Sequence, residues 1–294
     1  MDTVERVIVL EDGRKLHVCE AGRPDGVPVL VLHGTPGSNL VLTKWVEDAQ
    51  SRGIRLISYD RPGYGGSTRD PGRSVASAAE DVAAIARQLD LERLGVWGFS
   101  GGGPHSLACA ALLPDLVAAA GVIASPTPYQ ADGVDWFAGM GEDNIVEFGA
   151  ALDGEDALRA FIEGQVPGLL ETDTKVIMEA FGTLLSPVDA AVLTEENAGF
   201  LLRHMQMGIK DGGDGWIDDD LAFVKPWGFD LSGIEVPVLL LHGAHDKFVP
   251  FSHGEWLAGH TGNVEARLSA EDGHLTLVVD GASEVHGWLL SNLS

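Results

Sequence analysis

The chain has 294 residues, of which 45% are apolar, and its 44 acidic residues against 19 basic ones give a formal net charge of −25 at pH 7. This length allows one or two domains with a well-buried core. The negative charge excludes nucleic acids and anionic membranes as partners, because binding to either requires a basic patch.

The first segment predicts a β-hairpin. Residues 4–10 and 15–20 have the composition of strands, and the turn signal Asp12-Gly13 lies between them. The start of the chain is charged where a secretory signal would be basic and then apolar. No apolar run approaches the ~20 residues of a membrane-spanning helix. We therefore expect a cytoplasmic protein.

Apolar runs and helical stretches then alternate along the chain. The apolar runs are short and almost continuous, as is typical of strands covered on both faces. They comprise residues 29–32, 54–58, 94–97 and 117–124. Helical patterns separate them, at residues 41–52, 74–89 and 103–113. This alternation predicts an α/β fold with a mainly parallel, doubly wound sheet and helices on both faces.

The alternation stops after the sixth strand. Residues 126–228 are helix-like, aromatic and acidic, with no convincing buried strand. The earlier pattern then resumes, with strands and helices at residues 238–241, 254–259, 264–268 and 283–290. We therefore predict a core domain formed by residues 1–125 and 229–294, and a helical cap, or lid, inserted as residues 126–228.

The segment Gly98-Phe99-Ser100-Gly101-Gly102 is the most informative motif. It lies between an apolar strand and a helix of small residues, and a serine on such a tight turn is typical of a nucleophile elbow. Glycines stand two residues either side of the serine because strand and helix approach too closely for a Cβ atom. Pro104 replaces the lysine of a phosphate-binding loop, and Ser106 the third glycine of a dinucleotide motif. We therefore predict that Ser100 is a nucleophile.

A serine nucleophile needs a histidine base, and the histidine needs a carboxylate that orients it. After Ser100 in the chain, Asp246 directly follows the seventh predicted strand and His274 directly follows the eighth. His286 lies inside the last helical stretch, and Asp272 is too close in sequence to His274 to approach its ring from behind. The sequence therefore predicts a catalytic triad of Ser100, Asp246 and His274.

An oxyanion hole needs two backbone N–H donors beside the nucleophile. Gly101, directly after the serine, supplies one, and the start of the following helix adds a favourable field. The segment His33-Gly34-Thr35-Pro36-Gly37 follows the third predicted strand, so we predict that Thr35 supplies the second. Packing or hydrogen-bonding roles are assigned to the remaining histidines near the site, His33, His105, His242 and His245.

Three other features are predicted to be structural. The segment from Asp60 to Ser67 has the proline and glycine content of a tight turn. The acidic run from Asp211 to Asp220 lacks the spacing of a calcium loop, so we predict a solvated loop of the cap. Cys19 and Cys109 lie in strand-like and helix-like segments and are predicted to be core thiols.

The motifs together resemble those of the α/β-hydrolase fold superfamily, over nearly the whole chain. They are H-G-T-P-G at 33–37, the elbow at 98–102, H-G-A-H-D at 242–246 and D-G-H at 272–274, in the family's order and spacing. The resemblance implies the same triad and oxyanion hole. The H-G-x-P opening is also similar to epoxide hydrolases and haloalkane dehalogenases, whose nucleophile is an aspartate. Ser100 instead favours acyl transfer to water.

We therefore expect a carboxylesterase-like serine hydrolase that acts on a small, largely apolar ester and requires no cofactor or metal. The alternatives with the same triad are a proline-iminopeptidase-like amidase, a lactonase, a carbon–carbon bond hydrolase and a perhydrolase. A ligand receptor on the same fold is the alternative that is not an enzyme. If Glu142, Asp143 or Glu147 points into the pocket, it would grip a free amino terminus. The expected partner is a small molecule, and the sequence leaves open whether the chain forms a homo-oligomer.

Overall fold

An eight-stranded sheet lies at the centre of the computed structural model, which describes residues 3–293. The strand order is β1-β2-β4-β3-β5-β6-β7-β8. β2 (Lys15–Gly22) pairs antiparallel with both β1 (Val4–Val9) and β4 (Ile54–Tyr59). The remaining pairs are parallel, and they involve β3 (Val27–Leu32), β5 (Leu94–Phe99), β6 (Val117–Ile123), β7 (Val238–Gly243) and β8 (Val264–Ser269).

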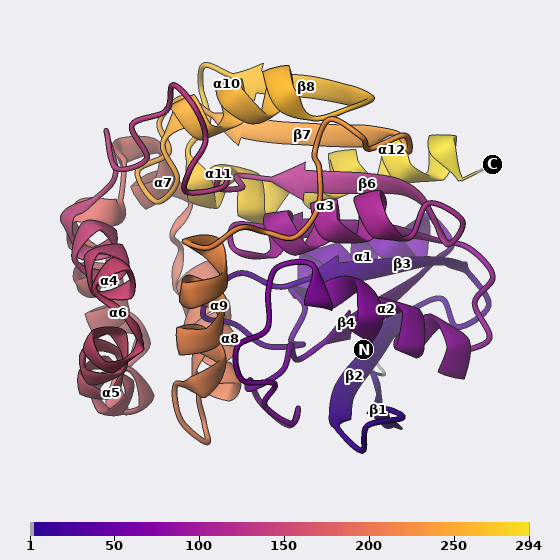
Figure 1. Cartoon of the computed structure of the whole chain (residues 1–294), viewed down its shortest axis with the longest axis horizontal. Helices are drawn as coiled ribbons and strands as arrows, with labels where there is room; N and C mark the ends of the chain where they lie inside the picture. The colour runs from indigo at the N-terminus through magenta and orange to yellow at the C-terminus, as the bar shows by residue number, and fades with distance from the viewer. Residues whose placement is uncertain (1–2, 294) are drawn as a thin grey trace.

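Helices cover both faces of this sheet (Figure 1). One buried apolar cluster joins the sheet to α2 (Ser77–Gln88), α3 (Gly102–Leu112) and α10 (Phe251–His260). A second cluster joins its other face to α1 (Thr43–Ser51), α11 (His274–Asp280) and α12 (Ala282–Asn292). Because the central strands are buried on both faces, their sequences are apolar without alternation. The predicted doubly wound α/β fold is confirmed.

The segment between β6 and β7 is helical. Its helices lie together beyond the carboxyl ends of the parallel strands, at the left of Figure 1. They are α4 (Glu142–Asp153), α5 (Glu155–Glu171), α6 (Thr174–Ala180), α7 (Pro187–Val192), α8 (Glu195–Gly208) and α9 (Asp214–Phe223), with a 3₁₀ turn at Gly182–Leu184. All fall inside the predicted insertion. Its division from the core at residues 126 and 228 stays a prediction.

Two local differences from the sequence-based expectation matter for the site. The prediction of a solvated loop is wrong for the second half of the acidic run, because Asp218, Asp219 and Asp220 are buried in α9. His274, expected in a loop after β8, is the first residue of α11.

Within residues 3–293 no helix combines the length and the hydropathy that crossing a membrane requires.

Candidate active site

Ser100 lies on a strained turn between β5 and α3. Its φ angle is +52°, in the left-handed region that residues with a side chain seldom adopt. A Cβ atom on Gly98 would lie 2.2 Å from the carbonyl oxygen of Gly102, and one on Gly102 would lie 2.0 Å from that of Leu32. The close approach predicted from the sequence is therefore present, and it requires glycine at both positions. The turn is fixed to the sheet by the Ser100 N–H, which donates to Ile123 O at 2.8 Å.

Asp246 and His274 form a buried pair. Asp246 Oδ1 accepts hydrogen bonds from the N–H groups of Phe248 and Val249 at 2.9 and 2.8 Å, and Oδ2 lies 2.7 Å from His274 Nδ1. Because a carboxylate only accepts, His274 Nδ1 carries the proton and Nε2 is left as a base. Burial acts to lower the pKa of His274, but the charge and hydrogen bond of Asp246 outweigh it and raise that pKa above 6.5.

Asp189 on α7 holds the first turn of the helix that carries His274. Its Oδ2 accepts from the N–H of His274 at 3.1 Å, and its Oδ1 accepts from those of Leu275 and Thr276 at 2.7 and 3.1 Å. These N–H groups have no partner inside α11 because they belong to its start. Asp189 is fully buried, so a side chain of the inserted segment fixes the backbone of the predicted base.

The loop after β3 packs Thr35 against the turn at Ser100. A Cβ atom on Gly101 would lie 2.3 Å from Thr35 Oγ1, so the two residues are in direct contact. Within residues 3–293, the backbone N–H groups of Thr35 and Gly101 donate no hydrogen bond to another residue. The two residues predicted to supply the oxyanion donors are thus in contact, and their N–H groups are not used in bonds to other described residues.

A buried carboxylate, Asp219, ties α9 to this loop. Its Oδ2 accepts hydrogen bonds from Thr35 Oγ1 and Tyr64 Oη, both at 2.8 Å, and from Arg61 Nη2 at 2.5 Å. Its Oδ1 accepts from Arg73 Nη1 at 2.5 Å. Burial acts to raise the pKa of Asp219, but the two guanidinium groups outweigh it and hold that pKa well below its ordinary range. Asp219 is therefore ionised, and it joins the inserted segment to the core beside Thr35.

The other histidines near the site have hydrogen-bonded or packing roles, as predicted. His33 Nδ1 lies 2.7 Å from Gly34 O, and His242 Nε2 lies 2.9 Å from Val249 O. His105 Nε2 lies 3.2 Å from Asp219, and burial lowers the pKa of His105 to about 4. His245 is exposed, and its backbone N–H donates to Asp272 O at 2.8 Å. His242 Nε2 lies 3.7 Å from Asp246 Oδ2, too far for a hydrogen bond, whereas His274 Nδ1 lies 2.7 Å from the same oxygen.

A cavity of about 590 Å³ brings the predicted site residues together. Gly34, Thr35, Ser100, Gly101 and His274 line it from the core. No hydrogen bond joins the Ser100 hydroxyl to His274 within the part of the chain that the structure describes. Asp246 stands behind His274, outside the lining.

The inserted segment supplies a large part of the remaining wall, which is mainly apolar. Its aromatic lining residues are Trp136, Phe148, Phe161, Phe181, Trp216 and Phe223. Of the acids singled out in the sequence, Asp143 and Glu147 line the cavity and Glu142 does not; Asp220 lines it as well. The cavity therefore combines an apolar wall with a local group of carboxyl side chains.

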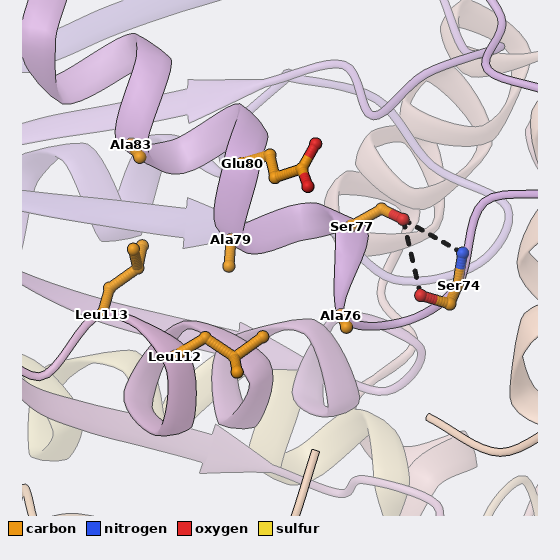
Figure 2. A pocket seen from close by; sticks show the side chains of 8 residues that line it. All are labelled: Ser74, Ala76, Ser77, Ala79, Glu80, Ala83, Leu112 and Leu113. Atoms are coloured by element: carbon orange, nitrogen blue, oxygen red, sulfur yellow. Dashed lines mark hydrogen bonds between the residues drawn. The ribbon is translucent and has the colours of Figure 1, made fainter. Parts of the chain in front are cut away.

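A second hollow, of about 380 Å³, lies away from this site (Figure 2). Ser77, Glu80 and Ala83 of α2 line it on one side, and Leu112 at the end of α3 on the other. Ser77 Oγ accepts a hydrogen bond from the Ser74 N–H at 3.1 Å. Among the described residues, those that line this hollow include Glu80 but no histidine.

Sequence reasoning missed Asp189 and the role of Asp219. Ser186-Pro187-Val188-Asp189 is a helix-start pattern, and Ser186 does cap α7. That pattern predicts an acid serving its own helix, not one that reaches α11. For Asp219, the available signal was its position in a helix-like stretch. One side of such a helix can face the core, so burial of Asp219 could have been considered.

Comparisons with known proteins agree with this fold. The sequence profile described as alpha/beta hydrolase fold matches residues 27–280. A non-heme chloroperoxidase of Streptomyces lividans is 27% identical, over 83% of this chain and 83% of its own. A pimeloyl-[acyl-carrier protein] methyl ester esterase of Nitrosomonas europaea is 26% identical, over 88% of this chain and 92% of its own. The solved structure of an esterase from Thermogutta terrifontis is 19% identical and superimposes with a TM-score of 0.68, covering 100% of both chains.

Proposed function

Because this chain belongs to the alpha/beta hydrolase fold family, we propose that it is a serine hydrolase that cleaves a carboxylic ester through an acyl-enzyme on Ser100. The observation that carries the proposal is the 2.7 Å contact between Asp246 and His274 Nδ1, which leaves Nε2 as a base at the cavity that Ser100 lines. A serine hydroxyl becomes a useful nucleophile when such a base removes its proton.

In the proposed reaction, His274 Nε2 takes the proton of Ser100 as its Oγ attacks the ester carbonyl carbon. The N–H groups of Thr35 and Gly101 stabilise the oxyanion of the tetrahedral intermediate. His274 then protonates the leaving alcohol, and the acyl group stays on Ser100. Water then attacks the acyl carbon as His274 Nε2 takes its proton, and His274 returns this proton to Ser100 Oγ as the Oγ–C bond breaks and the acid leaves. Since Ser100 and His274 are not hydrogen-bonded without substrate, we expect their contact to form in the substrate complex.

The cavity wall supports a small, largely apolar acyl group. Aromatic side chains of the inserted segment line the same cavity as Ser100. The volume of this cavity, about 590 Å³, is enough for a small organic molecule. The family relatives include an esterase and a chloroperoxidase, so family membership leaves the substrate open. An ester is proposed because Ser100 and two free N–H donors provide what acyl transfer requires.

The experiment is a comparison of wild-type enzyme with Ser100→Ala on 4-nitrophenyl acetate, butyrate and octanoate, and on proline 4-nitroanilide. Ser100→Ala should lower kcat at least ~10³-fold without changing the circular dichroism spectrum. Ser77→Ala, in the hollow of Figure 2, is the matched control and should keep its activity. A fluorophosphonate should label Ser100. Labelling at another residue would overturn the assignment, and faster turnover of the anilide would overturn the ester. Turnover of no substrate would favour a receptor.

A further inference from the structure

Two carboxyl groups meet in the wall of the cavity with no donor between them. Glu147 on α4 and Asp220 on α9 both line it, close enough for a hydrogen bond between their side chains if one is protonated. Glu147 Oε1 accepts a hydrogen bond from Trp216 Nε1 at 2.7 Å. Asp220 is fully buried, and neither of its oxygens receives a hydrogen bond within residues 3–293. A buried polar group without a partner is costly, so this pair calls for a proton or a ligand.

The surroundings do not neutralise the pair. Burial and the neighbouring Glu147 raise the pKa of Asp220 well above its ordinary range, and burial raises the pKa of Glu147 as well. Asp143 and Asp219 add further negative charge, and Arg73 is the cation that acts against them. Arg73 itself is bound to Asp219. Burial and the repulsion between the two carboxyl groups therefore favour a shared proton on the pair.

The pair lies close to the predicted chemistry. Asp220 precedes Phe223 by three residues on α9, which is just under one helical turn, or about 4.5 Å along the axis. Phe223 Cζ would lie 3.1 Å from a Cβ atom on Gly101, the predicted oxyanion donor. Both Asp220 and Phe223 line the cavity. Ser100 and the two carboxyl groups therefore line one cavity, and a substrate bound in it has access to both.

We propose that Glu147 and Asp220 form a subsite for an ammonium group of the substrate, an inference that rests on the proposed hydrolase function. An ammonium group carries several N–H donors and no acceptor, which matches carboxyl oxygens that lack donors. The rings of Trp136 and Phe148, with centroids 4.7 Å apart, also line this cavity, and aromatic rings attract cations. The net charge of −25 attracts cationic substrates to the protein. The substrate class is then an amine-bearing ester.

Binding of such a cation displaces the shared proton. The ammonium group takes the place of the proton between the two carboxylates, and that proton is released to solvent. Because the free pair must lose a proton, binding becomes tighter as the pH rises through the raised pKa of the pair. A pair that merely holds α4 to α9 would keep its proton and prefer no cation.

The test is isothermal titration calorimetry with benzylammonium and, as its neutral counterpart, benzyl alcohol. Wild-type protein should bind benzylammonium at least ~10-fold more tightly than the alcohol, because only the cation gains charge-assisted contacts. The double variant E147Q/D220N keeps the shape and removes the charge, and it should lose this preference. E142Q, on the same helix but outside the cavity lining, is the matched control and should retain it. Equal binding of the two probes by the wild type, or a preference that survives in E147Q/D220N, would overturn the proposal.

A second measurement uses only the wild-type protein, so it does not depend on the folding of a variant. Titration of the wild type with benzylammonium in two buffers of different ionisation enthalpy reports whether protons are released. Proton release is expected, and tight binding without it would overturn the assignment to the carboxyl pair. The assays involve no turnover, and S100A should behave like the wild type. Cation binding by an enzyme that hydrolyses no substrate would therefore refute the proposed function alone, and ester hydrolysis without a cation preference would refute the subsite alone.

Discussion

Replacement of Asp189 by asparagine tests how the predicted base is positioned. The carboxylate accepts three backbone N–H groups at the start of α11 and the Ser186 hydroxyl at 2.8 Å. Asparagine keeps one oxygen. If this oxygen stays with Leu275 and Thr276, the His274 N–H faces an NH₂ group instead of an acceptor. A buried hydrogen bond to a charged group contributes about 1.5–3 kcal/mol, so we expect Asp189→Asn to lower the free energy of unfolding by about 2–4 kcal/mol.

The same change should reach the chemistry through His274. A shift of a catalytic group by about 1 Å can cost ~10²-fold in rate, so we expect a ~10- to 100-fold lower kcat. The KM should change little because Asp189 does not line the cavity. The negative charge of Asp189 also helps to raise the pKa of His274. Its removal lowers that pKa, and the acid limb of the pH–rate profile should move to lower pH.

The assays are urea unfolding followed by circular dichroism, and 4-nitrophenyl butyrate hydrolysis as a function of pH. Asp173→Asn is the matched control, because Asp173 also accepts backbone N–H groups at a helix start, from Lys175 and Val176 at 2.9 and 3.0 Å. Asp173 is exposed and is not among the residues that line the cavity, so its kcat and pH profile should be unchanged. A purely structural role for Asp189 would predict lower stability with an unshifted acid limb, and that result would refute the positioning argument.

Three further predictions concern the pair at the base and the buried charges. The wild-type kcat/KM should rise with pH through an inflection above 6.5, because the base works when neutral and its pKa is raised; an inflection below 6.5 in a pH–rate series would contradict this. Asp246→Asn should lower kcat by ~10³- to 10⁴-fold on the same ester, while Asp272→Asn stays within ~10-fold; the reverse order would reassign the acid. Asp219→Asn should cost about 3–5 kcal/mol in urea unfolding, because it leaves the Arg61 and Arg73 charges buried without a full partner; an unchanged midpoint would show that they are otherwise compensated.

Much of the fold could be predicted from the sequence because its signals are local. Continuous apolar runs marked the parallel strands, and glycines marked the turn at Ser100. The order of motifs along the chain selected Asp246 and His274, since parallel strands deliver the residues after them to one edge of the sheet. Asp189 could not be found in this way, because it contacts His274 from 85 residues earlier in the chain. A pairing of that kind depends on how the inserted segment packs, which no spacing rule describes.

The three consecutive acids of α9 show why composition alone misplaced them. Successive helical residues point about 100° apart, so neighbours in sequence meet different surroundings. Asp218 pairs with Arg69 at 2.8 Å, Asp219 is enclosed by buried donors beside Thr35, and Asp220 faces Glu147 in the cavity. Read as a run of charge, the three residues predict a solvated loop. In the helix, Asp218 pairs with an arginine, Asp219 anchors α9 beside Thr35, and Asp220 forms part of the cavity wall. The acidity of this segment therefore has no single function, and each carboxylate has to be tested by its own contacts.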